Sequence, residues 1–177
     1  HGAEVHVAEQ PGLTHGFDAQ ITHQPNLYLL VSVADCTPIL IHDEQNGVVA
    51  GIHAGWRGTA AGIVTNTLKK MESLYGSKGE HCKAFIGACI GYANFEVGEE
   101  VATHFAPSFK RYDSSRDKWF VDLKAANSQQ LKSFGMPRCK TLKNSGPIRR
   151  KIFCGIRSGA RFWNGMNPMR NGLLAGN

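Results

Sequence analysis

Cys36 and His53 are the residues of this 177-residue chain whose types and spacing most clearly suggest chemistry. They lie at opposite ends of the segment CTPILIHDEQNGVVAGIH, in which two apolar, β-branched runs are separated by turn-forming residues. This pattern predicts a β-hairpin, and pairing of His42 with Gly47 would place Cys36 directly opposite His53. The Cβ atoms of such a pair lie about 4.5–5.5 Å apart. That spacing suits a thiolate and an imidazole that share one metal ion, and it also suits a nucleophilic Cys–His dyad.

The segment HAGWRG, residues 53–58, is expected to end a strand and to begin a helix. N–H groups at a helix N-terminus, close-approach glycines and an arginine together favour anion binding. Arg57 offers a bidentate fork for phosphate or carboxylate, and Trp56 offers a face on which a flat ring can stack. The alternative is a purely structural turn, in which Trp56 fills the core and Arg57 pairs with a nearby acidic residue.

A metal site with two protein ligands would be weak, so further ligands are required. Cys36 and His53 could be joined by one of six candidates: Asp35, His1, His6, His15, His23 and His42. His42 is expected on the other face of the hairpin and exposed, and His15 and His23 are expected in polar surface loops. Spacing alone does not choose among the N-terminal histidines, and Asp35 is expected to orient a ligating histidine or to cap a turn. The remaining cysteines are expected to be buried apolar residues, with Cys89 the exception that could line the pocket.

The sequence predicts a buried strand over residues 27–33 and further strands over 84–87 and 118–121, in addition to the hairpin. It predicts helices over residues 59–75, 97–105 and 123–134, with Gly76 ending the first and Asp122 capping the last. Neighbouring strands mixed with helices favour an α+β fold over a regular βαβ alternation. The pattern fades beyond Lys140.

Length and composition favour a single globular domain over residues 1–177, with 42% hydrophobic residues. No apolar run is long enough to span a membrane, no signal peptide opens the chain, and five cysteines suggest reduced thiols in a cytoplasmic protein. Residues 107–177 hold 15 Lys and Arg against 3 Asp and Glu. Such a basic segment could contact anions, but the chain has no aromatic RNA-binding box or zinc-finger spacing, which argues against a nucleic-acid partner.

Five motifs together resemble one family closely: VADCTPIL (33–40), HAGWRG (53–58), IGACIG (86–91), FEVGEEV (95–101) and VDLKAAN (121–127). It is the laccase-domain family, labelled multicopper polyphenol oxidoreductase and also described as broad-specificity purine nucleoside phosphorylase. The resemblance covers residues 1 to about 135 and implies a layered, αββα-like sandwich. It implies one metal ion, usually described as zinc, held by His1, Cys36 and His53 with a fourth position open, as in catalytic zinc sites.

The resemblance implies a metal-dependent purine nucleoside enzyme that needs no organic cofactor. Its reactions would be phosphorolysis of adenosine or inosine to a base and ribose 1-phosphate, together with deamination of adenosine. Cys36, His53 and Arg57 would be the catalytic residues, and Arg57 at the helix terminus would also hold phosphate. Trp56 and Glu96 are the expected contacts to the nucleoside. The partners would therefore be a small nucleoside and phosphate; the sequence does not fix an oligomeric state.

Three other functions compete with this one. A copper-dependent polyphenol oxidase matches the older label, and copper could replace zinc at such a site, but the chain has eight histidines and no His-x-His pair with which to build a multicopper centre. A Cys–His hydrolase would use Cys36 as nucleophile and His53 as base. A metal-stapled binding module is disfavoured because structural zinc normally takes four protein ligands.

The chain departs from the family pattern at both ends. Members usually carry some tens of residues before the His-Gly motif, so this chain is expected to be short at its N-terminus. The tail from about residue 140 is expected to be atypical, because IFCGIRSG (152–159) matches the family's C-terminal segment only loosely.

Overall fold

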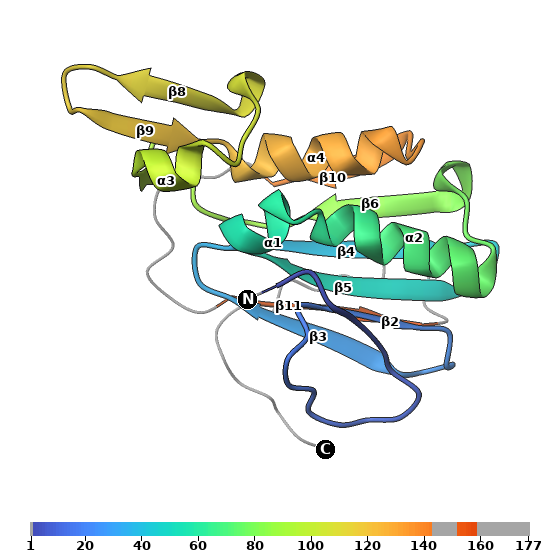
Figure 1. The fold of residues 1–177 in the computed structure, drawn as a ribbon. Coiled ribbons are helices and arrows are strands. Elements are labelled where there is room, and N and C mark those ends of the chain that lie inside the picture. The colour runs from blue at the N-terminus through green and yellow to red at the C-terminus, as the bar shows by residue number, and fades with distance from the viewer. Residues whose placement is uncertain (1, 143–151, 159–177) are drawn as a thin grey trace.

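A computed structural model describes residues 2–142 and 152–158 of the chain, which form a mixed α/β fold built in layers (Figure 1). The central layer is a six-stranded sheet. Its strands in spatial order are β1 (Val5–Val7), β2 (Ala19–Thr22), β5 (Val48–Ala54), β4 (Thr37–Asp43), β6 (Cys82–Ile86) and β10 (Arg138–Thr141). The edge strands β1 and β10 run parallel to their neighbours, and the other pairs are antiparallel.

Helices cover one face of the central sheet and a two-stranded ribbon covers the other (Figure 1). The helices are α1 (Trp56–Ala60), α2 (Ile63–Tyr75) and α4 (Leu123–Ser133), and the ribbon pairs β3 (Tyr28–Val33) with β11 (Ile152–Arg157). This arrangement of mixed sheets with helices packed outside confirms the α+β expectation. None of the helices in the described part of the chain has the length and apolar composition that crossing a bilayer requires.

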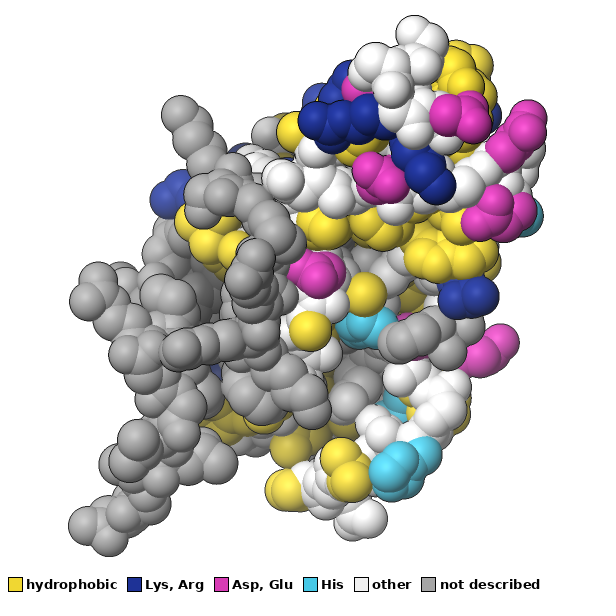
Figure 2. Space-filling model, turned by 90° about the vertical axis from the view of Figure 1, so that its left-hand side faces the viewer, with side chains coloured by type: hydrophobic (Ala, Val, Ile, Leu, Met, Phe, Trp, Pro, Cys, Tyr) yellow, Lys and Arg dark blue, Asp and Glu magenta, His cyan; other side chains and the backbone are white. Residues whose placement is uncertain are grey.

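A smaller lobe extends from one end of these layers (Figure 1). It contains the sheet β7 (Glu96–Val97), β9 (Lys118–Val121) and β8 (Lys110–Asp113), together with α3 (Glu99–Ala102) and the 3-10 turn Pro107–Phe109. A second 3-10 turn, Gly79–His81, precedes β6. Charged side chains of both signs gather on this lobe (Figure 2).

Strand β4 shows how the layers bury the sequence, because all seven of its residues are buried. Side chains alternate between the two faces of a strand. Ile39 and Ile41 pack in the helix-facing core with residues of α2, and Leu40 packs in the second core with Leu29 and Ile156 of the ribbon. A strand covered on both faces must be apolar throughout, which explains the continuous apolar run.

The hairpin of β4 and β5 forms as predicted, but its register differs by two residues from the expected one. His42 pairs with Val49 instead of Gly47, and Pro38 pairs with His53. The cause lies in the turn: Gly47 adopts a left-handed conformation with φ +67°, so it belongs to the turn and not to the strand. The Asp43 side chain stabilises this turn by accepting the backbone N–H of Gln45 at 3.0 Å.

The helix predicted over residues 59–75 is divided into α1 and α2. Gly62 takes a left-handed conformation with φ +76° and separates them, while Gly76, also left-handed, ends α2 as predicted. The helix expected over residues 97–105 is limited to the four residues of α3. Asp122 caps α4 as expected, with its Oδ1 accepting the Ala125 N–H at 2.9 Å.

Three further expectations are wrong. His42 is buried, because it lies an even number of residues from Cys36 and so shares the ribbon-facing side of β4. Strand β11, which pairs with β3, falls in the tail where no element was predicted; most of the rest of that tail lies outside the described residues. The strand predicted over 27–33 is only half-buried, since the alternate residues Tyr28, Leu30 and Ser32 are exposed.

Candidate metal centre and active site

Cys36 and His53 meet where β4 begins and β5 ends. Because His53 pairs with Pro38, Cys36 lies diagonally across from His53 and not directly opposite it. A shift of two residues preserves the face on which a side chain lies, so both still point toward the ribbon side. A Cβ atom built on Gly55 would lie 3.2 Å from Cys36 Sγ and 3.9 Å from His53 Cε1. Gly55 thus leaves open the space that the two side chains share.

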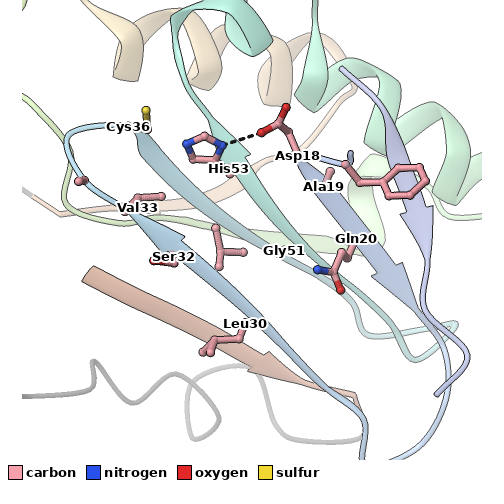
Figure 3. A pocket seen from close by; sticks show the side chains of 12 residues that line it. Asp18, Ala19, Gln20, Leu30, Ser32, Val33, Cys36, Gly51 and His53 are labelled. Atoms are coloured by element: carbon pink, nitrogen blue, oxygen red, sulfur yellow. Dashed lines mark hydrogen bonds and ion pairs between the residues drawn. The ribbon is translucent and has the colours of Figure 1, made fainter. Parts of the chain in front are cut away.

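Asp18 holds the His53 ring in place. Its Oδ1 lies 2.8 Å from His53 Nδ1, and its backbone carbonyl accepts the His53 N–H at 2.7 Å. Because a carboxylate can only accept, His53 carries its proton on Nδ1. The other ring nitrogen faces the side on which Cys36 lies (Figure 3). The second oxygen of the Asp18 carboxylate accepts the backbone N–H of Gly2.

Asp18 is the site residue that sequence reasoning missed. It precedes β2 and lies 35 positions before His53, so no local spacing connects the two. From the sequence, Asp35 was the residue expected to orient a ligating histidine or to cap a turn, whereas in the structure Asp18 contacts His53. Asp35 adopts a left-handed conformation with φ +68° in the turn just before Cys36. A signal did exist, because a histidine ligand usually donates its second ring N–H to a carboxylate or a carbonyl.

The Cys36 thiol is half-buried in an electronegative setting. Burial raises its pKa, and the negative charges of Asp35, Asp18 and Cys89 raise it further. The thiol is therefore uncharged near neutral pH unless a cation offsets these charges.

The chemistry of this donor set fits a metal ion. A sulfur and an imidazole nitrogen turned to the same side, with the imidazole oriented by a carboxylate, is the arrangement that metal-binding histidines use. Within residues 2–142 and 152–158, no three His, Cys, Asp or Glu side chains are grouped closely enough to hold a metal. The third ligand predicted from the resemblance, His1, lies outside the described residues. Its chain neighbour Gly2 donates a hydrogen bond to Asp18, which also contacts His53.

A cavity of about 460 Å³ opens beside this pair, between β2, the end of β5 and β3 (Figure 3). Polar and apolar groups both line it, and its polar side chains are Asp18, Gln20, Ser32, Cys36 and His53. The Gln20 amide is held from one side, since its Nε2 donates to Thr14 Oγ1 at 2.9 Å. A cavity of this size with few convergent polar groups is typical of small-molecule sites.

The other expected site residues lie outside the lining of that cavity. Trp56 and Arg57 open α1 directly after Gly55, and the Arg57 guanidinium lies 4.3 Å from the Trp56 ring. Trp56 is half-buried against the core of the lobe, while Arg57 is exposed. Glu96 is exposed in β7. The structure therefore joins Cys36 and His53 in one site, places the Trp–Arg pair next to them in the chain, and places Glu96 in the lobe.

The remaining histidine candidates lie apart from the Cys36–His53 pair. The rings of His6 and Phe17 are in contact, with centroids 5.0 Å apart. His15 and His23 are exposed, as expected, and His23 Nδ1 lies 3.3 Å from the Tyr75 hydroxyl. Burial lowers the pKa of His42, at the far end of β4 from Cys36.

Known proteins resemble this chain in sequence and in fold. A Bacteroides thetaiotaomicron protein named purine nucleoside phosphorylase is 44% identical over 131 residues, which cover 71% of this chain and 48% of that protein. Adenosine deaminase RL5, from an unknown prokaryotic organism, is 32% identical over 144 residues, covering 78% and 55%. The crystal structure of YlmD from Geobacillus stearothermophilus matches with a TM-score of 0.70 and 25% identity, covering 81% of this chain and 60% of that one.

The chain spans about half the length of the curated relatives it matches. A family model described as multi-copper polyphenol oxidoreductase laccase matches residues 1–162. That match includes both strands of the hairpin, Asp18 and the Trp–Arg pair. The chain therefore belongs to the multi-copper polyphenol oxidoreductase laccase family.

Proposed function

We propose that this chain carries the catalytic centre of a metal-dependent purine nucleoside enzyme. The reactions are phosphorolysis of adenosine or inosine and deamination of adenosine. One observation carries the proposal: Asp18 holds His53 so that its second ring nitrogen faces Cys36, at the edge of a cavity of about 460 Å³. The names of the similar proteins, purine nucleoside phosphorylase and adenosine deaminase, support this reaction class.

Cys36, His53 and His1 would hold the metal, with zinc the proposed ion and copper able to take its place. A bound metal ion would supply Lewis-acid chemistry and would lower the pKa of water at the site. Asp18 keeps the imidazole proton on Nδ1, so that Nε2 remains the ligating atom. Gly55 keeps the space between sulfur and ring open.

Substrate is proposed to occupy the cavity, with apolar residues of β3 against the base. In phosphorolysis the C1′–N bond breaks, a phosphate oxygen forms the new bond to C1′, and the base leaves with a proton. Arg57 is exposed at the first turn of α1, where its guanidinium can donate two hydrogen bonds to phosphate oxygens. Its contact with Trp56 orients the guanidinium plane. Trp56 and Glu96 remain proposed nucleoside contacts.

A Cys–His hydrolase is the second candidate. In it Cys36 would be the nucleophile, His53 the base and Asp18 the acid that orients the base. The raised pKa of Cys36 disfavours it. Burial and the nearby carboxylates oppose the thiolate that such an enzyme needs at neutral pH.

The test begins with protein purified without chelators, whose metal content is measured by mass spectrometry. Adenosine and inosine are then assayed with and without phosphate, alongside a phenol oxidation assay. We expect phosphate-dependent release of the base that Cys36→Ala abolishes. Cys139→Ala, at a half-buried thiol in β10, is the matched control and should retain activity.

Three outcomes would contradict the proposal. Full nucleoside activity after complete metal removal, with inactivation by a thiol alkylating agent, would favour the hydrolase. Phenol oxidation that appears only with added copper, with both nucleoside assays silent, would favour the polyphenol oxidase. Unchanged phosphorolysis in Cys36→Ala would exclude Cys36 from the centre.

A further inference from the structure

Cys36 has a second cysteine opposite it, on the strand that flanks β4 on the other side from β5. Strands β4 and β6 pair antiparallel, and the pairing continues past the end of β6. The backbone N–H of Gly87 donates to the carbonyl of Pro38 at 2.9 Å. Two residues before Pro38 is Cys36, and two residues after Gly87 is Cys89. The antiparallel pairing therefore places the two cysteines opposite each other.

A second backbone hydrogen bond lies on the other side of the two cysteines. The Ile90 N–H donates to the Asp35 carbonyl at 2.9 Å, so backbone bonds lie on both sides of the two cysteines with equal numbers of residues between them. Opposite residues in a regular antiparallel ladder have Cα atoms about 4.5–5.5 Å apart. Disulfides need Cα atoms about 4.4–6.8 Å apart. The hydrogen bonds on both sides hold the Cys36 and Cys89 backbones close together, although Asp35 is left-handed and the ladder is not regular here.

The surroundings of the pair agree with this placement. Cys89 is fully buried and Cys36 is half-buried beside the cavity, and both are reduced. Burial and the nearby carboxylates oppose the Cys36 thiolate, so its reaction with peroxide is expected to be slow. Gly55 has no side chain to restrict the Cys36 sulfur. Cys36 lines the cavity, whereas the buried Cys89 is not part of its lining.

We propose that Cys36 and Cys89 are a site of oxidative modification, at which a peroxide converts the two thiols into a disulfide. The Cys36 sulfur attacks one oxygen of hydrogen peroxide, the O–O bond breaks, the leaving hydroxide takes up the thiol proton as water, and Cys36 becomes a sulfenic acid. The Cys89 sulfur then attacks the Cys36 sulfur; the S–S bond forms, the S–O bond breaks, and the second water leaves. Both sulfurs are oxidised and the peroxide is reduced by two electrons.

The modification would remove the sulfur ligand from the proposed metal centre, a consequence that rests on the proposed function. A sulfur in a disulfide is no longer a thiolate and cannot ligate as one. Oxidation would then release the metal and stop turnover, and a thiol reductant would restore both. Conversely, a metal bound to the Cys36 thiolate would protect the pair from peroxide.

The test uses the full chain and peptide mass spectrometry, because trypsin separates all five cysteines. Cleavage after Arg57, Lys83 and Lys110 leaves Cys36 in peptide 1–57 and Cys89 in peptide 84–110. The protein is treated with hydrogen peroxide, its remaining thiols are alkylated, and it is digested without reductant. We expect a linked 1–57/84–110 peptide that disappears after reduction. It should be lost in Cys89→Ser and retained in Cys154→Ser, at a half-buried thiol also near Gly87.

The outcomes separate this proposal from the metal centre. If peroxide leaves both thiols reduced, converts Cys36 only to sulfinic or sulfonic acid, or links Cys36 to another cysteine, the proposal is wrong. A linked peptide that forms equally fast with and without added zinc would support the thiol pair but contradict the proposed metal centre. Circular dichroism of each variant checks that the fold is retained, and the wild-type result stands if a variant fails to fold.

Discussion

Replacing Asp18 with asparagine should weaken metal binding without disturbing the fold. The carboxylate makes two contacts at once, because one oxygen accepts the His53 ring N–H at 2.8 Å and the other accepts the Gly2 N–H. An asparagine side chain has the same shape but only one oxygen, so it can satisfy only one of these donors. If its NH₂ group faces His53, the ring must move its proton to Nε2, the atom that would ligate the metal.

The expected magnitude follows from the role of such carboxylates. Loss of the group that orients a ligating histidine typically weakens metal affinity by about 10–100-fold. This corresponds to about 1.4–2.8 kcal/mol of binding free energy. The Asp18 and His53 side chains are 14% and 16% exposed, so solvent offers little compensation for the lost contact.

The assay is a competition titration of zinc between the protein and a chromophoric chelator, for wild type and Asp18→Asn. Asp122→Asn is the matched control, because it makes the same chemical change at a helix N-cap, where asparagine and aspartate are about equally good. Zinc affinity should fall only in the first variant. Equal affinity of Asp18→Asn and wild type would refute the role given to Asp18.

Three further predictions concern the glycines and the pH dependence of stability. Gly55→Ala adds a methyl group 3.2 Å from Cys36 Sγ, so a zinc titration should show affinity reduced by about tenfold or more while the circular dichroism spectrum is unchanged. Gly62→Ala should lower the free energy of unfolding by about 1–2 kcal/mol in urea, because φ is +76° there; Gly12→Ala, with open space and no positive φ, should leave it unchanged. Burial opposes the ionisation of Asp43, but hydrogen bonds from Asn46 and Gln45 lower its pKa. Its charge therefore contributes stability above about pH 4 that is lost on acidification, and Asp43→Asn should flatten the fall in unfolding free energy between about pH 5 and pH 2. If the unfolding free energy of Asp43→Asn falls with acidification as steeply as that of wild type, the prediction for Asp43 is wrong.

Sequence patterns predicted the hairpin because its signals are local. The apolar runs and the turn residues lie within one short segment, and Cys36 and His53 both line one cavity. The two-residue register error arose at Gly47, whose left-handed conformation extends the turn. The Asn-Gly dipeptide is a known signal for such a turn. The split between α1 and α2 has a similar origin, since Gly62 interrupts a hydrophobic pattern that otherwise continues.

Features that depend on distant pairing could not be predicted from local patterns. Asp18 reaches His53 only because β2 pairs with β5, and nothing near either residue specifies that pairing. Strand β11 was missed because its pattern is weak and its partner β3 lies far away in the sequence. Alternate residues of β3 are exposed because only one face of the β3–β11 ribbon packs on the central sheet, and the local sequence does not specify which face.

The pairing of Tyr28 with Arg157 has a consequence for the order in which this protein assembles during synthesis. Cys36 and His53 lie on one hairpin, whose formation closes only a short loop. Strand β3, which forms a wall of the cavity, pairs with β11, which is synthesised much later. Long-range strand pairing is slow because it must overcome the entropy of closing a large loop. A nascent chain that has not yet reached β11 would therefore hold the two side chains of the proposed metal centre before the β3 wall of the proposed substrate cavity has formed.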